Sequence, residues 1–145
     1  MFRSFYPAST ELTETAPFGQ YADFYTRRAG LTQNKLAACA RVNQSRLNKI
    51  VNEAIRDVPV NLLVNLCLVL GLDQVEAKDF LARKERAFSP ANPMHQCYLE
   101  LIQIYAEKEP DYRRIPTWNL SSVLDEADTY LKERGFSTLP NYHLL

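Results

Sequence analysis

Apolar residues recur along most of the chain at steps of three and four, which is the spacing of one helix face. Between residues 18 and 29 this spacing connects Phe18, Tyr21, Tyr25 and Ala29. The same period predicts two short helices between residues 31 and 52, and four more at about 59–70, 74–86, 93–107 and 119–134. No segment shows the alternation of a strand, so the pattern predicts an all-α fold.

Residues at the ends of these segments support the predicted boundaries. Thr32, Asn43 and Asp73 each precede a helix and can accept a hydrogen bond from a free backbone N–H of its first turn. Pro59 suits the first turn of the helix that follows it. Glycines, which readily end helices, follow three of the segments: Gly30, Gly71 and Gly135.

The proline-containing segment 89–93 divides the chain. We therefore expect three parts: an N-terminal arm (1–17), a five-helix domain (18–86) and a C-terminal helical extension (87–145). The amphipathic helices of the extension are the expected surface for a homodimer or another partner.

The segment 31–52 contains two short helices joined by a tight corner. In the second helix, Leu47 and Ile50 define the buried direction when residues are placed about 100° apart. The opposite face then carries short polar side chains and one lysine: Gln44, Ser45, Asn48, Lys49 and Asn52. Two helices at this spacing are typical of the unit that places one helix in the major groove of DNA.

The order of residues in this region resembles the helix-turn-helix of phage repressor and Cro-type regulators, also called xenobiotic-response-element-type regulators. The resemblance extends from about residue 20 to residue 81. It is carried by segment 28–33, by Leu36-Ala37 and Val42-Asn43, and by Leu47 and Ile50. It implies a five-helix repressor-like domain, followed here by two further helices. It also implies sequence-specific binding of double-stranded DNA by helix 44–51, usually as a dimer.

The resemblance also implies roles for individual residues. Those matching Gln44, Ser45 and Lys49 read base edges, and Asn48 joins them because its amide can pair with adenine. The residue matching Gln33 meets phosphate and braces the reading helix, and the residue matching Asn52 binds phosphate. Charge alone adds three candidates for contacts with the DNA backbone: Arg41, Arg46 and Arg56.

Two departures from the family pattern leave an alternative open. Arg41 stands where the family has a corner glycine, so either the corner is strained or its geometry differs. Glu53 and Asp57 follow the second helix, where they would face phosphate unfavourably. The alternative function is a protein-interaction module, such as a mobile-element accessory or a signalling adaptor, that has kept the helices and lost DNA binding.

Charge is distributed unevenly although the net charge of the chain is zero. Between residues 20 and 72, seven basic side chains outnumber three acidic ones, which gives +4. From residue 87 onward, five basic and eight acidic side chains give −3. The asymmetry favours a DNA-facing half and a partner-facing half.

Other chemistry has little support in the sequence. The four glycines form no phosphate-binding loop, and no nucleophile elbow or zinc-binding His-Glu-Xaa-Xaa-His is present. The odd number of cysteines, Cys39, Cys67 and Cys97, is best interpreted as three small buried apolar residues. We therefore expect no enzyme activity, no catalytic residue, no metal and no cofactor. The sequence shows neither a membrane-length apolar run nor a secretion signal, which predicts a cytoplasmic protein.

Overall fold

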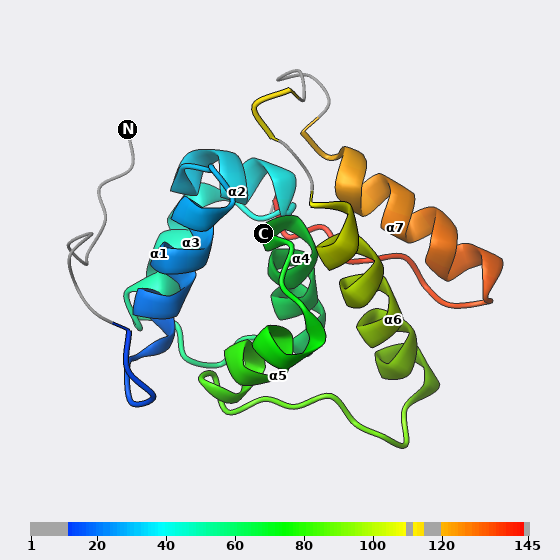
Figure 1. The fold of residues 1–145 in the computed structure, drawn as a ribbon, viewed down its shortest axis with the longest axis horizontal. Helices are drawn as coiled ribbons and strands as arrows, with labels where there is room; N and C mark the ends of the chain where they lie inside the picture. Colours follow the sequence, from blue (N-terminus) through cyan, green and yellow to red (C-terminus); the bar gives the residue numbers. More distant parts are fainter. Residues whose placement is uncertain (1–11, 110–111, 115–119, 144–145) are drawn as a thin grey trace.

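The computed structural model describes residues 12–109, 112–114 and 120–143. Within these residues the fold is all-helical, which confirms the predicted fold class (Figure 1). The seven helices are α1 (Phe18–Arg28), α2 (Gln33–Cys39), α3 (Gln44–Val51), α4 (Val60–Leu70), α5 (Gln74–Ala82), α6 (Pro93–Lys108) and α7 (Ser122–Glu133). Most of the N-terminal arm, and the predicted start of the last helix at 119, lie outside the described residues.

The predicted N-caps are present. The Thr32 hydroxyl accepts from the Lys35 N–H at 3.2 Å, and the Asn43 side chain accepts from the Arg46 N–H at 2.8 Å. Asp73 accepts from the Glu76 N–H at 2.8 Å, and Glu76 accepts from the Asp73 N–H at 3.1 Å, which completes a capping box. Each cap satisfies a backbone donor that the helix itself leaves unpaired, so the local sequence sets these boundaries.

Helix α4 lies at the centre of the fold. Every residue from 62 to 70 is buried. Figure 1 shows α1, α2 and α3 on one side of α4 and α6 and α7 on the other, with α5 below. The central helix therefore has an apolar cover on all sides, as its continuous apolar sequence requires.

The two C-terminal helices belong to the same core. Buried residues of α6, such as Leu101 and Ile102, join one apolar cluster with α4 and with Leu124 and Leu131 of α7. The apolar stripes that suggested a partner surface are thus occupied within the chain. Burial of α6 and α7 on α4 therefore stabilises the extension and the five-helix unit together.

The three cysteines are buried and free, in accord with their interpretation as small apolar residues. Burial raises the pKa of the Cys39 thiol to about 11, and it raises the pKa of Cys67 as well. None of the helices in the described part of the chain is long and apolar enough to cross a membrane.

Candidate nucleic-acid interface

The corner between α2 and α3, residues 40–43, turns through a left-handed residue. Arg41 has a φ of 57°, in the region that favours glycine. The Val42 N–H donates to the Ala37 carbonyl at 3.1 Å, which closes the end of α2. Of the two alternatives for the corner, the structure therefore shows the strained one, with arginine in a conformation that suits glycine.

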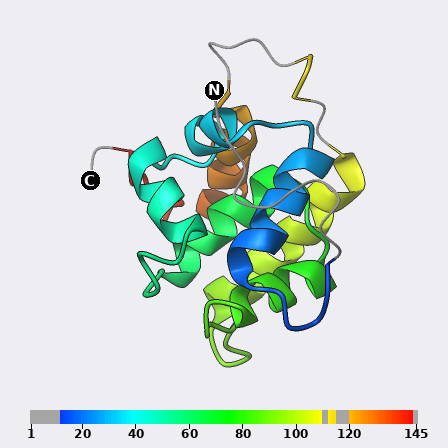
Figure 2. The same cartoon turned by 90° about the vertical axis from the view of Figure 1, so that its left-hand side faces the viewer.

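The outer face of α3 is open to solvent. Leu47 and Ile50 are each only 1% exposed and fix the helix on the core. Figure 2 shows α3 at the edge of the fold. On its outer side, Gln44, Ser45, Lys49 and Asn52 are exposed, whereas Asn48 is half-buried. The polar groups predicted to read base edges therefore project from one rigid, anchored helix.

Gln33 lies beneath this face, at the start of α2. Its side chain is only 3% exposed, and its Nε2 donates to the Asn48 Oδ1 at 3.5 Å, at the long end of hydrogen-bond distances. This contact joins α2 to the middle of α3. The structure places Gln33 as a brace for Asn48 and offers little of its side chain to an outside phosphate.

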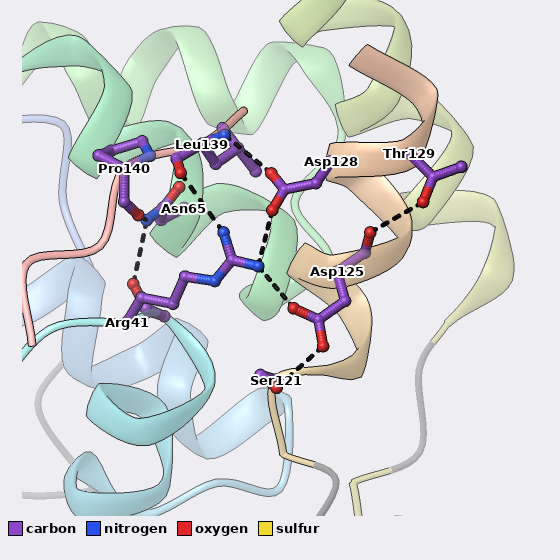
Figure 3. Close-up of polar contacts among 9 residues, drawn as sticks. Arg41, Asn65, Ser121, Asp125, Asp128, Thr129, Leu139 and Pro140 are labelled. Atoms are coloured by element: carbon purple, nitrogen blue, oxygen red, sulfur yellow. Dashed lines mark hydrogen bonds and ion pairs between the residues drawn. The ribbon is translucent and has the colours of Figure 1, made fainter. Parts of the chain in front are cut away.

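Arg41 points away from the outer face of α3 and toward α7. One guanidinium nitrogen lies 2.6 Å from an Asp125 oxygen and 2.8 Å from an Asp128 oxygen (Figure 3). Burial lowers the pKa of Arg41, but the hydrogen bonds to Asp128 and Asp125 outweigh that effect and raise it above its usual value. Because both carboxylates already hold this charge, we do not include Arg41 among the proposed phosphate contacts.

The C-terminal segment, residues 139–143, runs along the same corner. The Tyr142 N–H donates to the Arg41 carbonyl at 2.7 Å. The side chain of Asn65 donates to the carbonyls of Ala40 and Pro140, each at 3.1 Å (Figure 3). Beside α3, the guanidinium of Arg46 lies 5.3 Å from the centre of the Tyr142 ring. The corner is therefore held on one side by α4 and on the other by the end of the described chain.

The two acidic residues after α3 each pair with a cation of the same chain. Glu53 has a φ of 70°, and its carboxylate accepts from the Lys84 ammonium at 2.9 Å. Asp57 forms an ion pair with Arg86. Both partners, Lys84 and Arg86, lie just after α5. Lys84 therefore balances the charge of Glu53, whereas Asp57, whose side chain is 90% exposed, pairs with Arg86 at the surface.

The remaining two candidates lie at or after the end of α3. Asn52 is the C-cap residue, and its side-chain oxygen accepts from the Ala54 N–H at 3.0 Å. Asn52 is exposed. Arg56 is exposed on the connection to α4. Both are placed where they can meet a ligand that lies along α3.

Sequence reasoning missed the residues that support the corner, namely Asn65, Asp125, Asp128 and Tyr142. One of them carried a signal. Asn65 interrupts the apolar run 62–70, and an amide in a helix that is buried all round needs hydrogen-bond partners. The others lie on or after α7, 84 or more residues from Arg41, and nothing in the local pattern connects them to it.

A cleft of about 900 Å³ opens elsewhere, between the ends of α1, α4 and α6 and the start of α5. Its lining carries charges of both signs, and two of them, Arg28 and Glu76, pair across it at 2.5 Å. The lining therefore selects no ligand of one charge, and α3 remains the better candidate.

Neither a search for metal-binding groups in the described residues nor comparison with known proteins adds another candidate site. The part of the chain that the structure describes contains no group of three or more His, Cys, Asp or Glu side chains arranged to hold a metal ion. Comparisons with protein-family models, with curated proteins and with solved structures found no match to this chain.

Proposed function

We propose that this protein binds double-stranded DNA through α3 and acts as a sequence-specific transcriptional regulator. In this proposal α1–α5 form a repressor-like helix-turn-helix domain, and α3 enters the major groove. The observation that carries the proposal is the outer face of α3, where exposed polar groups stand on a helix whose other side is fixed in the core. A helix about 10–12 Å in diameter fits a major groove about 12 Å wide.

The chemistry of that face suits base recognition. The amides of Gln44 and Asn48 can pair with adenine through two hydrogen bonds, and Lys49 can donate to the O6 and N7 atoms of guanine. Ser45 can contact either kind of base. The contact from Gln33 to Asn48 limits the motion of one of these amides before DNA arrives. Asn52 and Arg56 are proposed contacts with the DNA backbone.

Repulsion between DNA phosphates and the acidic residues after α3 should be weaker than the sequence alone indicated. Phosphate contacts dominate non-specific affinity for DNA, so unpaired carboxylates beside α3 would oppose binding. Glu53 and Asp57 are instead paired with Lys84 and Arg86. The excess positive charge of residues 20–72 therefore supports the approach of a phosphate backbone.

A dimer is part of the proposal because one reading helix covers only about a half-site. The buried faces of α6 and α7 pack against α4, so the dimer contact has to use other surfaces of these helices. Size-exclusion chromatography with light scattering measures the oligomeric state directly, with and without DNA.

Selection from a random DNA pool, followed by a salt titration on the selected duplex, tests the function. We expect the logarithm of the affinity to fall linearly with the logarithm of salt concentration, because phosphate contacts release counterions. Lys49→Ala and Gln44→Ala should each cost about 1–3 kcal/mol of binding free energy on that duplex. Lys132→Ala, which removes an exposed lysine from α7, is the matched control and should change the affinity little.

The alternative is an interaction module without DNA binding, which the zero net charge of the chain favours. It predicts that selection from the DNA pool yields no preferred sequence and that Lys49→Ala does not change the affinity for DNA. These two results together would overturn the proposed regulator function and favour the interaction module.

A further inference from the structure

We propose that the C-terminal segment completes the DNA-contacting surface, with Tyr142 as a positioning residue that holds Arg46 toward a phosphate of the groove wall. The inference rests on the proposed function and deepens it. It adds residues 139–143 to the interface. This segment lies about 100 residues after the α2–α3 corner in sequence and is not part of the helix-turn-helix.

The position of Arg46 on α3 indicates a contact with the DNA backbone. At about 100° per residue, Arg46 lies at the margin of the exposed face, between Lys49 and the buried Ile50. When a helix lies in the major groove, its centre line meets the bases and its flanks meet the sugar-phosphate walls. Arg46 is therefore placed for phosphate rather than for a base.

Tyr142 limits where the Arg46 guanidinium can go. The guanidinium carbon lies 5.3 Å from the ring centre, within the distance at which a cation is attracted to an aromatic face. The ring itself is fixed at both ends. Its hydroxyl donates to the Asn61 side chain at 3.0 Å, and the backbone N–H of the same residue donates to the Arg41 carbonyl at 2.7 Å.

The charge of Arg46 is still available to an outside anion. Within the described residues Arg46 forms no ion pair, whereas Arg41, at the same corner, is held by two aspartates. Arg46 is half-buried: its Nε is buried and has no hydrogen-bond partner among the described residues, so the exposed part of the guanidinium is what an outside anion would meet. A long flexible side chain that is already held in place loses less freedom when it binds, so the affinity rises without a new contact.

The test is a double-mutant cycle on the DNA duplex obtained by selection, or on a random-sequence duplex if selection gives no preference. Arg46→Ala should weaken binding about threefold to tenfold and lower the salt slope by about one. Tyr142→Leu should lower the slope by the same amount, and the double variant should lose no more than either single one. Tyr142→Phe keeps the ring and should keep the slope.

Tyr130→Leu is the matched control. Tyr130 also lies under an arginine, Arg134, with 3.3 Å from the guanidinium carbon to the ring centre, but on α7. We expect this variant to keep the wild-type slope. A purely structural role for Tyr142 would change affinity and thermal stability while the slope stayed at the wild-type value, and that result would overturn the inference.

A measurement on the unmodified protein covers the case in which Tyr142→Leu fails to fold. The Arg46 Nε–H resonance should show an upfield ring-current shift in free protein and should move again on addition of DNA. Absence of the ring-current shift overturns the inference and leaves the proposed function standing. If the wild-type protein binds no DNA at all, the proposed function and the inference both fail.

Discussion

At the scale of the residue, Arg41 combines two opposed effects. Its left-handed backbone, with a φ of 57°, costs a non-glycine residue about 1 kcal/mol. Its side chain meanwhile joins the corner to α7 through Asp125 and Asp128. Asp128 is mostly buried and also accepts from the Leu139 N–H at 2.8 Å. Arg41 therefore neutralises a carboxylate that holds the C-terminal segment on α7.

Substitution at this position can separate the two effects. Arg41→Ala and Arg41→Gly both remove the ion pairs, but only glycine also removes the backbone strain. We expect Arg41→Ala to lower the free energy of unfolding by about 1 kcal/mol more than Arg41→Gly. Urea denaturation followed by circular dichroism measures both. Equal stability of the two variants would contradict the strained corner.

At the scale of the element, the end of α3 is fixed by a residue outside it. Lys84, whose side chain is 1% exposed, donates to the Ile50 carbonyl at 3.0 Å, to the Ile55 carbonyl at 3.2 Å and to Glu53. Carbonyls at the C-terminal end of a helix have no partner within the helix. A cation there is also attracted to the negative end of the helix dipole. Lys84 thus links α3, the turn after it and the end of α5.

Loss of this ammonium should destabilise the protein. Lys84→Met keeps much of the length and the apolar stem. It leaves Glu53 and the Ile55 carbonyl without the ammonium, and the Ile50 carbonyl with only the long contact from the Glu53 N–H at 3.4 Å, which should cost about 2–3 kcal/mol. Lys78→Met, which removes an exposed lysine of α5, is the control and should stay within about 0.5 kcal/mol of wild type. Guanidinium denaturation provides the comparison, and similar unfolding midpoints for the two variants would contradict the role of Lys84.

Helices could be predicted from the sequence because their signals are local. Thr32, Asn43 and Asp73 lie within a turn of the donors that they cap, and the apolar period needs only a few turns to be visible. The exposed face of α3 followed from the same period. The partners of the candidate site could not be predicted. Lys84 lies 31 residues from Glu53, and the charge of a residue does not show which distant residue it meets.

At the scale of the whole molecule, amphipathic stripes identified α6 and α7 as helices but did not identify their partner. The same stripe serves a dimer or the core of one chain, and here it packs on α4. Asn65 lies at the centre of this arrangement, fully buried, with hydrogen bonds to the corner and to the C-terminal segment. Asn65 therefore links the α2–α3 corner and the C-terminal segment to α4.

Removal of residues 90–145 tests this arrangement. The shortened chain would expose apolar surface of α4 that α6 and α7 cover, so we expect it to lose its cooperative thermal transition and to bind the dye ANS. Differential scanning calorimetry and dye fluorescence measure the two effects. A shortened chain with a sharp transition and no dye binding would show instead that the first five helices fold independently.

The contact between Arg41 and the carbonyl of Leu139 spans 98 residues, and this has a consequence for biosynthesis. A ribosome adds about 5–20 residues per second, so the corner is made several seconds before the segment that supports it. During that interval the nascent chain contains the residues of α2 and α3 but neither the aspartates that hold Arg41 nor the aromatic ring beside Arg46. The proposed DNA-contacting surface should therefore be complete only late in translation, when α7 and residues 139–143 have emerged.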